Sequence, residues 1–274
     1  MNWKKILIGK WSWKRPIYSL ASVYGLLLLV SCTLTDRILF IPPAASYTES
    51  YPDLDFIKTA KNESIAFVHL PAGKGMPTIL YSHGNAEDLA QSSLLYEGFH
   101  ALGLGVFAYD YPGYGLSTGT PNEDSCQRAI QSSWNHLKNI GVPASSIVVV
   151  GRSVGSGPSV WLASREKPSS LILISPFKSV FTTAFPTPFP LFPGDRFPNL
   201  KRIRKINTPL LVIHGENDEV IPFSHGKKLF EASPASTKEF LPIPIAGHND
   251  LFNLASKDII TKVAEFALKQ PPAH

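Results

Sequence analysis

Short apolar runs that alternate with helix-like segments constrain the fold of this 274-residue chain more than any other feature. Several of these runs are apolar at consecutive positions, so both faces of the strand that each would form are apolar. Such strands are typical of a parallel sheet that helices cover on both sides. The predicted strands are 64–70, 78–83, 105–111, 146–151, 171–175, 210–215 and 238–245.

Two of the intervening segments carry apolar residues at helical spacing. They are Cys126, Ile130, Trp134, Leu137 and Ile140 in one segment, and Phe252, Ile259, Val263 and Phe266 in the other. The alternation predicts an α/β fold with a doubly wound, mostly parallel sheet over residues 62–274. The Phe- and Pro-rich stretch 176–207 interrupts it, and we expect a short cap insertion there over the C-terminal edge of the sheet.

The net positive charge of the chain resides in its N-terminal segment. The formal net charge is +5, and residues 1–31 contain no acid and five cations, which are Lys4, Lys5, Lys10, Lys14 and Arg15. The rest of the chain is therefore neutral, so we expect no basic face for nucleic acid and no nucleic-acid partner. The two cysteines, Cys32 and Cys126, provide neither a disulfide framework nor a zinc cluster.

The basic N-terminal segment leads into the apolar run 17–30. This run is shorter than the roughly 20 residues of a spanning helix, but it suits the core of a signal peptide. Its end, Leu29-Val30-Ser31-Cys32, resembles the lipobox of bacterial lipoproteins, where small residues precede a cysteine that is lipidated after cleavage.

We therefore expect residues 1–31 to be a signal peptide or membrane anchor, Cys32 to be the lipidation site, and residues 32–61 to be a tether leading into the fold. The alternative is an uncleaved anchor in which Cys32 has no role. In both cases the positive charges hold the N-terminus in the cytoplasm. The domain would then be membrane-anchored on the non-cytoplasmic side, in a bacterial cell envelope.

A single serine follows the most apolar predicted strand, 146–151. The sequence there is Gly151-Arg152-Ser153-Val154-Gly155, a G-x-S-x-G motif, and helix-forming residues come next. A sharp strand-to-helix turn forces its central residue into a strained backbone conformation, and small flanking residues keep Cβ atoms out of the way. The Ser153 hydroxyl would then lie at a helix N-terminus, where dipole and amides favour negative charge, so Ser153 is the candidate nucleophile.

A serine hydroxyl needs a base, and His248 is the candidate among the eight histidines. It differs from the others because it lies between the last predicted strand and the last predicted helix. Asp218, after strand 210–215, is the candidate acid, and the order Ser153, Asp218, His248 is that of α/β-hydrolases. Asp250 is the alternative acid, although its position also suits a cap of the final helix.

An oxyanion hole needs two backbone amides. The N–H of Val154, directly after the candidate nucleophile, would be one. The other is expected from Asn85, in the loop His83-Gly84-Asn85-Ala86 that follows strand 78–83. We expect His83 to be structural.

Five stretches together resemble the α/β-hydrolase superfamily over roughly residues 36–270. They are SHGNAEDLAQ (82–91), YDYPGYGLSTG (109–119), GRSVGSGPSVWLASR (151–165), LLVIHGENDEVIPFSHG (210–226) and GHNDL (247–251). In particular, the chain resembles the membrane-associated α/β-hydrolase-domain group that includes eukaryotic protein depalmitoylases and related bacterial proteins of unassigned substrate.

The resemblance implies the same roles for the same residues. These are Ser153 as nucleophile, Asp218 as acid, His248 as base, and Asn85 with Val154 as the oxyanion hole. One departure is the N-terminus, because the animal depalmitoylases attach to the membrane through a cysteine-rich cytoplasmic segment. A translocating segment here would place the domain on the opposite side, so cytosolic protein depalmitoylation does not carry over.

The sequence therefore predicts a serine hydrolase that cleaves acyl esters or thioesters through an acyl-serine intermediate. The cap insertion is crowded with Phe177, Phe181, Phe185, Phe189 and Phe192, which we expect to divide between its own small core and an acyl-chain site. The alternatives are a serine peptidase of the prolyl-oligopeptidase type and a non-catalytic lipoprotein that binds ligands. We expect no metal and no cofactor, and the oligomeric state stays open.

Overall fold

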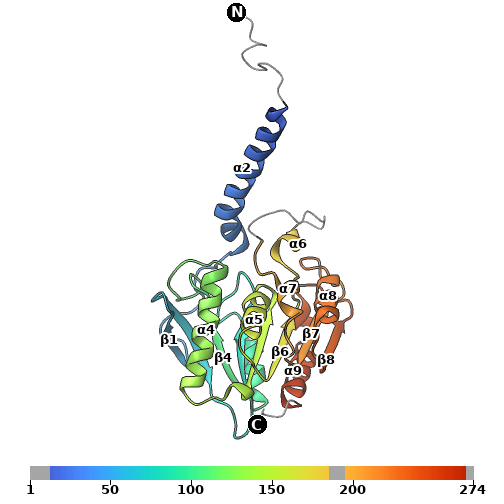
Figure 1. Cartoon of the computed structure of the whole chain (residues 1–274). Helices are drawn as coiled ribbons and strands as arrows, with labels where there is room; N and C mark the ends of the chain where they lie inside the picture. Colours follow the sequence, from blue (N-terminus) through green and yellow to red (C-terminus); the bar gives the residue numbers. More distant parts are fainter. Residues whose placement is uncertain (1–12, 185–194, 270–274) are drawn as a thin grey trace, which may run out of the picture.

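An eight-stranded sheet forms the centre of the molecule (Figure 1), in the order β1-β2-β4-β3-β5-β6-β7-β8. The computed structural model describes residues 13–184 and 195–269, except for the side chains of 30–34 and 184. Strand β2 pairs antiparallel with both β1 and β4, and the remaining pairs are parallel. The strands are β1 (Leu54–Lys58), β2 (Ser64–Leu70), β3 (Thr78–Ser82), β4 (Gly105–Tyr109), β5 (Ile147–Arg152), β6 (Ser170–Ile174), β7 (Leu210–Gly215) and β8 (Lys238–Ile243).

Helices cover both faces of this sheet. The helices of the domain are α3 (Ser93–Ala101), α4 (Glu123–Asn139), α5 (Ser156–Ala163), α6 (Val180–Ala184), α7 (Asn199–Ile203), α8 (Ser224–Ala232) and α9 (Leu251–Leu268), with short 3-10 turns at Ala144–Ser146 and Ser153–Gly155. Apolar residues of α4, α5, α7 and α8 pack in one core cluster, and those of α3 and α9 pack in a second. The valines of β5 are needed because the strand is buried on both faces. Val149 belongs to the first cluster, whereas Val148 and Val150 belong to the second.

The predicted fold class is confirmed, and the seven predicted strands correspond to β2–β8 with ends shifted by a few residues. One strand, β1, was not predicted from the sequence. Strand β1 lies within 32–61, the segment expected to be a tether, and it pairs with β2 at the edge of the sheet. Most of its residues are exposed or half-buried, so the alternation of apolar and polar residues that marks a half-buried strand is absent from its sequence.

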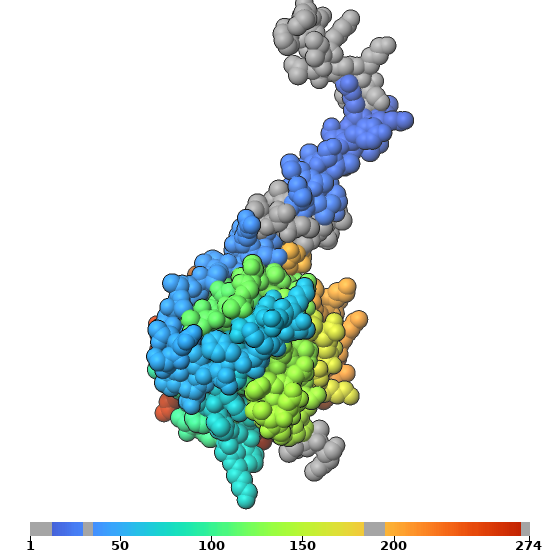
Figure 2. All heavy atoms as spheres, turned by 90° about the vertical axis from the view of Figure 1, so that its left-hand side faces the viewer, coloured from blue at the N-terminus to red at the C-terminus, as the bar shows by residue number. Residues whose placement is uncertain are grey.

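A long helix, α2 (Lys14–Leu39), precedes the domain; its C-terminal end contacts the domain and the rest projects away from it (Figures 1 and 2). It ends shortly before Pro42-Pro43, which cannot continue a helix. It runs without a break across the expected boundary between residues 31 and 32, and that boundary stays a prediction. The side chain of Cys32 lies outside the described residues, as do residues 1–12 of the expected signal peptide or anchor.

Large apolar side chains are exposed along α2. Those with more than half of their surface exposed are Trp13, Ile17, Tyr18, Leu20, Val23, Leu26, Leu29 and Ile38. Within residues 13–184 and 195–269, no helix combines the length and the apolar character that crossing a membrane requires.

Candidate active site

Ser153 lies at a sharp turn between β5 and α5. Its backbone has a φ of 51°, a left-handed conformation that is unusual for a residue other than glycine. The turn also demands glycine on both sides, because a Cβ atom on Gly155 would lie 2.2 Å from the carbonyl oxygen of Ser82, and one on Gly151 would lie 2.5 Å from that of Gly155. The G-x-S-x-G sequence thus produces the strained strand-to-helix turn that it predicts.

The structure brings Ser153, His248 and Asp218 together from three loops at the C-terminal ends of β5, β8 and β7. The Nε2 atom of His248 lies 3.0 Å from Ser153 Oγ, and its Nδ1 atom lies 2.8 Å from Asp218 Oδ2. A carboxylate only accepts, so we assign the imidazole proton to Nδ1, which leaves Nε2 as the acceptor for the Ser153 hydroxyl. This arrangement can transfer a proton from the serine to the imidazole.

The carboxylate of Asp218 is held from several directions. Its Oδ1 atom accepts the amides of Val220 (3.0 Å) and Ile221 (2.7 Å), and Nε2 of the buried His214 lies 3.3 Å from Oδ2. Burial alone would raise the pKa of Asp218, but the contacts with His214, His248 and the Ile221 amide outweigh it and hold the pKa well below its usual range. Asp218 is therefore ionised at neutral pH.

Asp250, the alternative acid, has different partners. Its Oδ1 atom accepts the amide of Gly247 at 2.7 Å, and although Asp250 occupies the N-cap position of α9 its side chain makes no capping hydrogen bond. The interpretation of Asp250 as a helix cap is therefore wrong in its detail. Its carboxylate instead stabilises the loop that carries His248.

The loop after β3 shares a pocket with Ser153, because both Asn85 and Val154 line the pocket beside Ser153. Val154 occupies the first turn after Ser153, where backbone N–H groups lack helical acceptors. Glu87 connects this loop to the serine turn, because its carboxylate accepts both the amide of Gly84 and Arg152 Nη1, the latter at 2.6 Å. Asn85 and Val154 thus both lie at the pocket that holds Ser153, and their role as the oxyanion hole stays a prediction.

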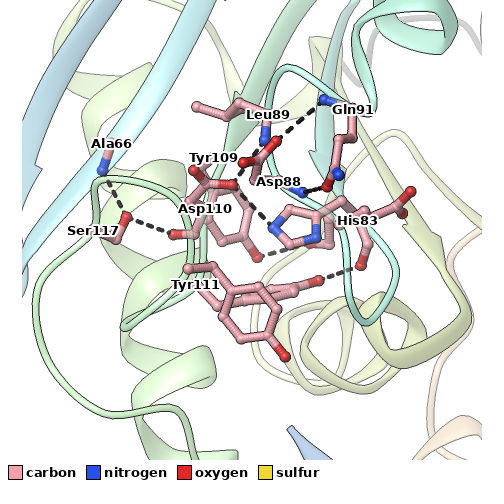
Figure 3. Close-up of polar contacts among 12 residues, drawn as sticks. Ala66, His83, Asp88, Leu89, Gln91, Tyr109, Asp110, Tyr111 and Ser117 are labelled. Carbon is pink, nitrogen blue, oxygen red and sulfur yellow. Dashed lines mark hydrogen bonds and ion pairs between the residues drawn. The ribbon is translucent and has the colours of Figure 1, made fainter. Parts of the chain in front are cut away.

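A buried polar cluster lies beneath this loop (Figure 3). Asp110 accepts the amide of Leu89 at 3.0 Å and the hydroxyl of Tyr47, and Nε2 of His83 lies 3.3 Å from Asp110 Oδ1, away from ideal hydrogen-bond alignment. His83 Nδ1 contacts the carbonyl oxygen of Gly84 at 2.7 Å. Burial lowers the pKa of His83, but the Asp110 carboxylate outweighs burial and raises the pKa above its usual value. His83 therefore lies in a supporting position, consistent with the structural role expected for it.

A pocket of about 790 Å³ opens beside Ser153 and His248. Phe177 and Phe181 of the cap insertion line it, whereas Phe185, Phe189 and Phe192 lie outside the described residues. Further apolar walls come from the cap insertion, the loop after β7 and the end of α2, namely Val180, Val220, Ile221, Ile38, Leu39 and Ile41. The pocket size and its apolar lining are typical of small-molecule sites.

The sequence did not reveal several parts of this site. His214 precedes Asp218 by four residues, and Glu87 follows Asn85 by two, but nothing in those spacings distinguishes a supporting contact from a solvated side chain. The end of α2 is separated from Ser153 by more than a hundred positions in the chain.

Within residues 13–184 and 195–269, no group of three or more His, Cys, Asp or Glu side chains is arranged to hold a metal ion.

Comparisons with known proteins agree with this architecture. Residues 74–192 match the family described as "Serine aminopeptidase, S33". Among solved structures, an esterase from Pyrococcus furiosus superposes with a TM-score of 0.69 at 18% identity, over 84% of this chain and 99% of that one. A monoacylglycerol lipase from Paleococcus ferrophilus superposes with a TM-score of 0.57 at 18% identity, over 74% of this chain and 99% of that one. At these identities the structures establish the fold.

Sequence relatives are considerably nearer. The alpha/beta hydrolase domain-containing protein aho-3 of Caenorhabditis elegans is 38% identical over 80% of this chain and 74% of its own length. The alpha/beta hydrolase domain-containing protein 17B of Homo sapiens is 40% identical over 71% of this chain and 68% of its own length. The chain therefore belongs to the α/β-hydrolase superfamily, among the alpha/beta hydrolase domain-containing proteins.

Proposed function

We propose that the protein is a serine hydrolase that cleaves acyl esters or thioesters. The observation that carries the proposal is the continuous chain of hydrogen bonds from Ser153 Oγ through His248 to Asp218 at the edge of an apolar pocket. An ionised acid, an oriented imidazole and a serine within 3.0 Å are the parts that activate a hydroxyl.

The reaction begins when His248 Nε2 takes the proton of the Ser153 hydroxyl as Oγ attacks the carbonyl carbon. The carbonyl oxygen becomes an oxyanion, which the amides of Val154 and Asn85 stabilise, while Asp218 stabilises the imidazolium. The tetrahedral intermediate collapses, the bond to the leaving group breaks, and His248 returns the proton to the departing alcohol or thiol. Water, deprotonated by His248, then hydrolyses the acyl-serine in the same two steps and releases the acid.

The pocket supports an acyl substrate. Phe177, Phe181 and Ile221 line the pocket together with Ser153. The charged side chains of the lining, Glu87 and Arg152, pair with each other at 2.6 Å. Burying an alkyl chain against such a surface is favourable by about 0.8 kcal/mol for each methylene.

Labelling with a fluorophosphonate probe tests the nucleophile. The parent protein should be labelled, and Ser153→Ala should abolish labelling and lower hydrolysis of short acyl esters by several orders of magnitude while the circular-dichroism spectrum is unchanged. Hydrolysis at the parental rate by Ser153→Ala would remove Ser153 from this role. A parent that neither labels nor hydrolyses any acyl substrate would instead favour a non-catalytic binding module.

The description of the matching family as a serine aminopeptidase supports peptide hydrolysis as a second candidate function. The same serine chemistry cleaves amides, so the labelling experiment does not separate the two. A panel of 4-nitrophenyl acyl esters, acyl thioesters and peptide 4-nitroanilides separates them. Preference for the anilides would make the protein a peptidase.

We also propose that the N-terminal segment anchors the protein to a membrane, with Cys32 as the lipidated first residue of the mature chain. The basic segment before the apolar run 17–30, the small residues before Cys32 and the exposed apolar side chains of α2 support an anchor. Two or more acyl chains would hold it stably. Intact-mass measurement of membrane-extracted protein should give a lipidated species that starts at Cys32, and a species that starts at Met1 without lipid would favour an uncleaved anchor.

A further inference from the structure

The end of α2 forms one wall of the pocket beside Ser153. Thr35, Ile38 and Leu39 of the helix line this pocket, as does Ile41 just after it. Figure 1 shows α2 meeting the domain near α6 of the cap insertion, and Val180, Phe181 and Thr183 of that insertion line the same pocket. The helix that precedes the domain is therefore also part of its active-site cavity.

The wall is fixed to the cap insertion. Asp36, in the last turn of α2, accepts two hydrogen bonds from the guanidinium of Arg196, at 2.8 Å from Nε and 3.1 Å from Nη2. The next contact along the chain is apolar, because the buried ring of Phe40 packs edge-on against Phe197 with 6.3 Å between ring centroids. These contacts hold the helix end at a defined distance from the insertion.

The wall is also fixed to the loop that carries the candidate oxyanion amide. The Asn85 side chain donates to the carbonyl oxygen of Leu39 at 2.6 Å and accepts the amide of Ile41 at 3.1 Å. The Tyr114 hydroxyl donates to Asn85 Oδ1 at 2.6 Å and so fixes the orientation of the amide group. Asn85 therefore contacts the helix end through its side chain, so the end of α2 is joined to a residue of the pocket lining.

Two apolar side chains of the wall remain largely open to solvent. Ile38 is 73% exposed and Ile41 is 59% exposed, although both line the pocket. An alkyl chain that reaches the pocket mouth would cover them, and each apolar group removed from water stabilises the bound state. Asn85 contacts the chain at Leu39 and Ile41, whereas Thr35 lies four residues before Leu39 on α2. Contacts with the more distant residues of the wall therefore act on the distal part of a long substrate.

We propose that the last turn of α2 is a specificity-determining wall for the acyl chain, in which Thr35 and Ile38 contact the carbons farthest from the scissile carbonyl. The inference rests on the proposed acyl-hydrolase function and deepens it. It makes preference for long chains a property of the N-terminal helix as well as of the cap insertion.

The test is the chain-length profile of the full-length protein in detergent. The ratio of kcat/KM for a 4-nitrophenyl dodecanoate to that for the butanoate is measured for the parent and for Ile38→Ser. Since each methylene contact corresponds to about fourfold, loss of contact with two or three methylenes should lower the ratio by about tenfold or more. Thr35→Trp, which places bulk in the cavity, should lower the same ratio.

Leu94→Ser is the matched control, because Leu94 is 83% exposed on α3, lies outside the pocket lining and is retained when the chain is processed before Cys32. It should leave the ratio at the parental value. Parental ratios in both Ile38→Ser and Thr35→Trp, with unchanged melting temperatures, would contradict the proposed role of the wall. An equal fall in Leu94→Ser would also contradict it, because the effect would then belong to exposed apolar surface in general. A parent that hydrolyses neither ester refutes the acyl-hydrolase function itself, which is a different outcome.

Discussion

Asp218 and Asp250, the two candidate acids for His248, have different partners, and this difference can be measured. Asp218→Asn should lower kcat by about 10⁴-fold, because the asparagine amide would favour the wrong tautomer of His248. Asp250→Asn should retain activity within severalfold, because its remaining oxygen can still accept the amide of Gly247. Steady-state kinetics on a short acyl ester measures both. A large loss in Asp250→Asn together with full activity in Asp218→Asn would make Asp250 the acid.

For single residues, the sequence could predict the candidate catalytic side chains but not the neighbouring side chains that hold them in place. Ser153 was recognisable because only glycine tolerates the close approaches on either side of it, and His248 because of its place between the last strand and the last helix. The contact of His214 with Asp218 could not be read in the same way. It depends on a buried ring lying 3.3 Å from a carboxylate, and burial of that side chain is a property of the packed fold.

The turn between β5 and α5 is the element that places the candidate nucleophile, and its tolerance for added atoms is small. Gly155→Ala would put a Cβ atom 2.2 Å from the carbonyl oxygen of Ser82, so the turn must shift away from β3. We expect the free energy of unfolding to fall by about 1–3 kcal/mol, as for overpacking in a core, and fluorophosphonate labelling of Ser153 to slow. Urea titration and labelling rates measure the two effects.

Gly25→Ala, made in the unprocessed chain that retains residues 1–31, provides the control for that substitution. Gly25 lies in α2, and a Cβ atom there meets nothing within 4 Å. This variant should label at the parental rate. Parental stability and labelling in Gly155→Ala would show that the turn has more freedom than its packing indicates.

The strands of the central sheet were predictable because a strand that is buried on both faces has apolar residues at consecutive positions. Strand β1 was not, since an exposed edge strand carries no such pattern. The role of the end of α2 was equally hidden. It depends on the ion pair between Asp36 and Arg196, residues 160 positions apart, and neither one marks the other in the sequence.

The stability of the whole molecule should depend on pH through the buried pair of His83 and Asp110. Because the folded pKa of His83 is raised, its contribution to stability is fully present below its unfolded pKa and is lost as the pH rises through the folded pKa. Between about pH 6 and about pH 9, the free energy of unfolding should therefore fall more steeply in the parent than in Asp110→Asn, which lacks the carboxylate that raises the pKa of His83.

Urea titrations of both proteins at the two pH values provide the comparison. Asp218 affects the pH dependence of stability only at acidic pH. Because its pKa is lowered in the folded state, its contribution to the free energy of unfolding is present above its unfolded pKa of about 3.9 and declines only as the pH falls below that value. It therefore does not contribute to the difference between neutral and alkaline conditions. Equal pH dependence in the parent and Asp110→Asn would exclude the pair as its source.

The unbroken course of α2, pinned at its last turn by Asp36, makes the helix a spacer of fixed length as well as a wall. A helix of 26 residues is about 39 Å long, whereas the part from residue 32 onward is only about 12 Å long. Under the proposed anchor, the apolar run 17–30 lies in the membrane before processing and the lipid on Cys32 holds the chain there afterwards, so in both forms only about 12 Å of helix separates the lipid surface from the domain. A domain held so near the surface meets substrates by lateral diffusion, so its turnover would follow the surface density of substrate and not the bulk concentration.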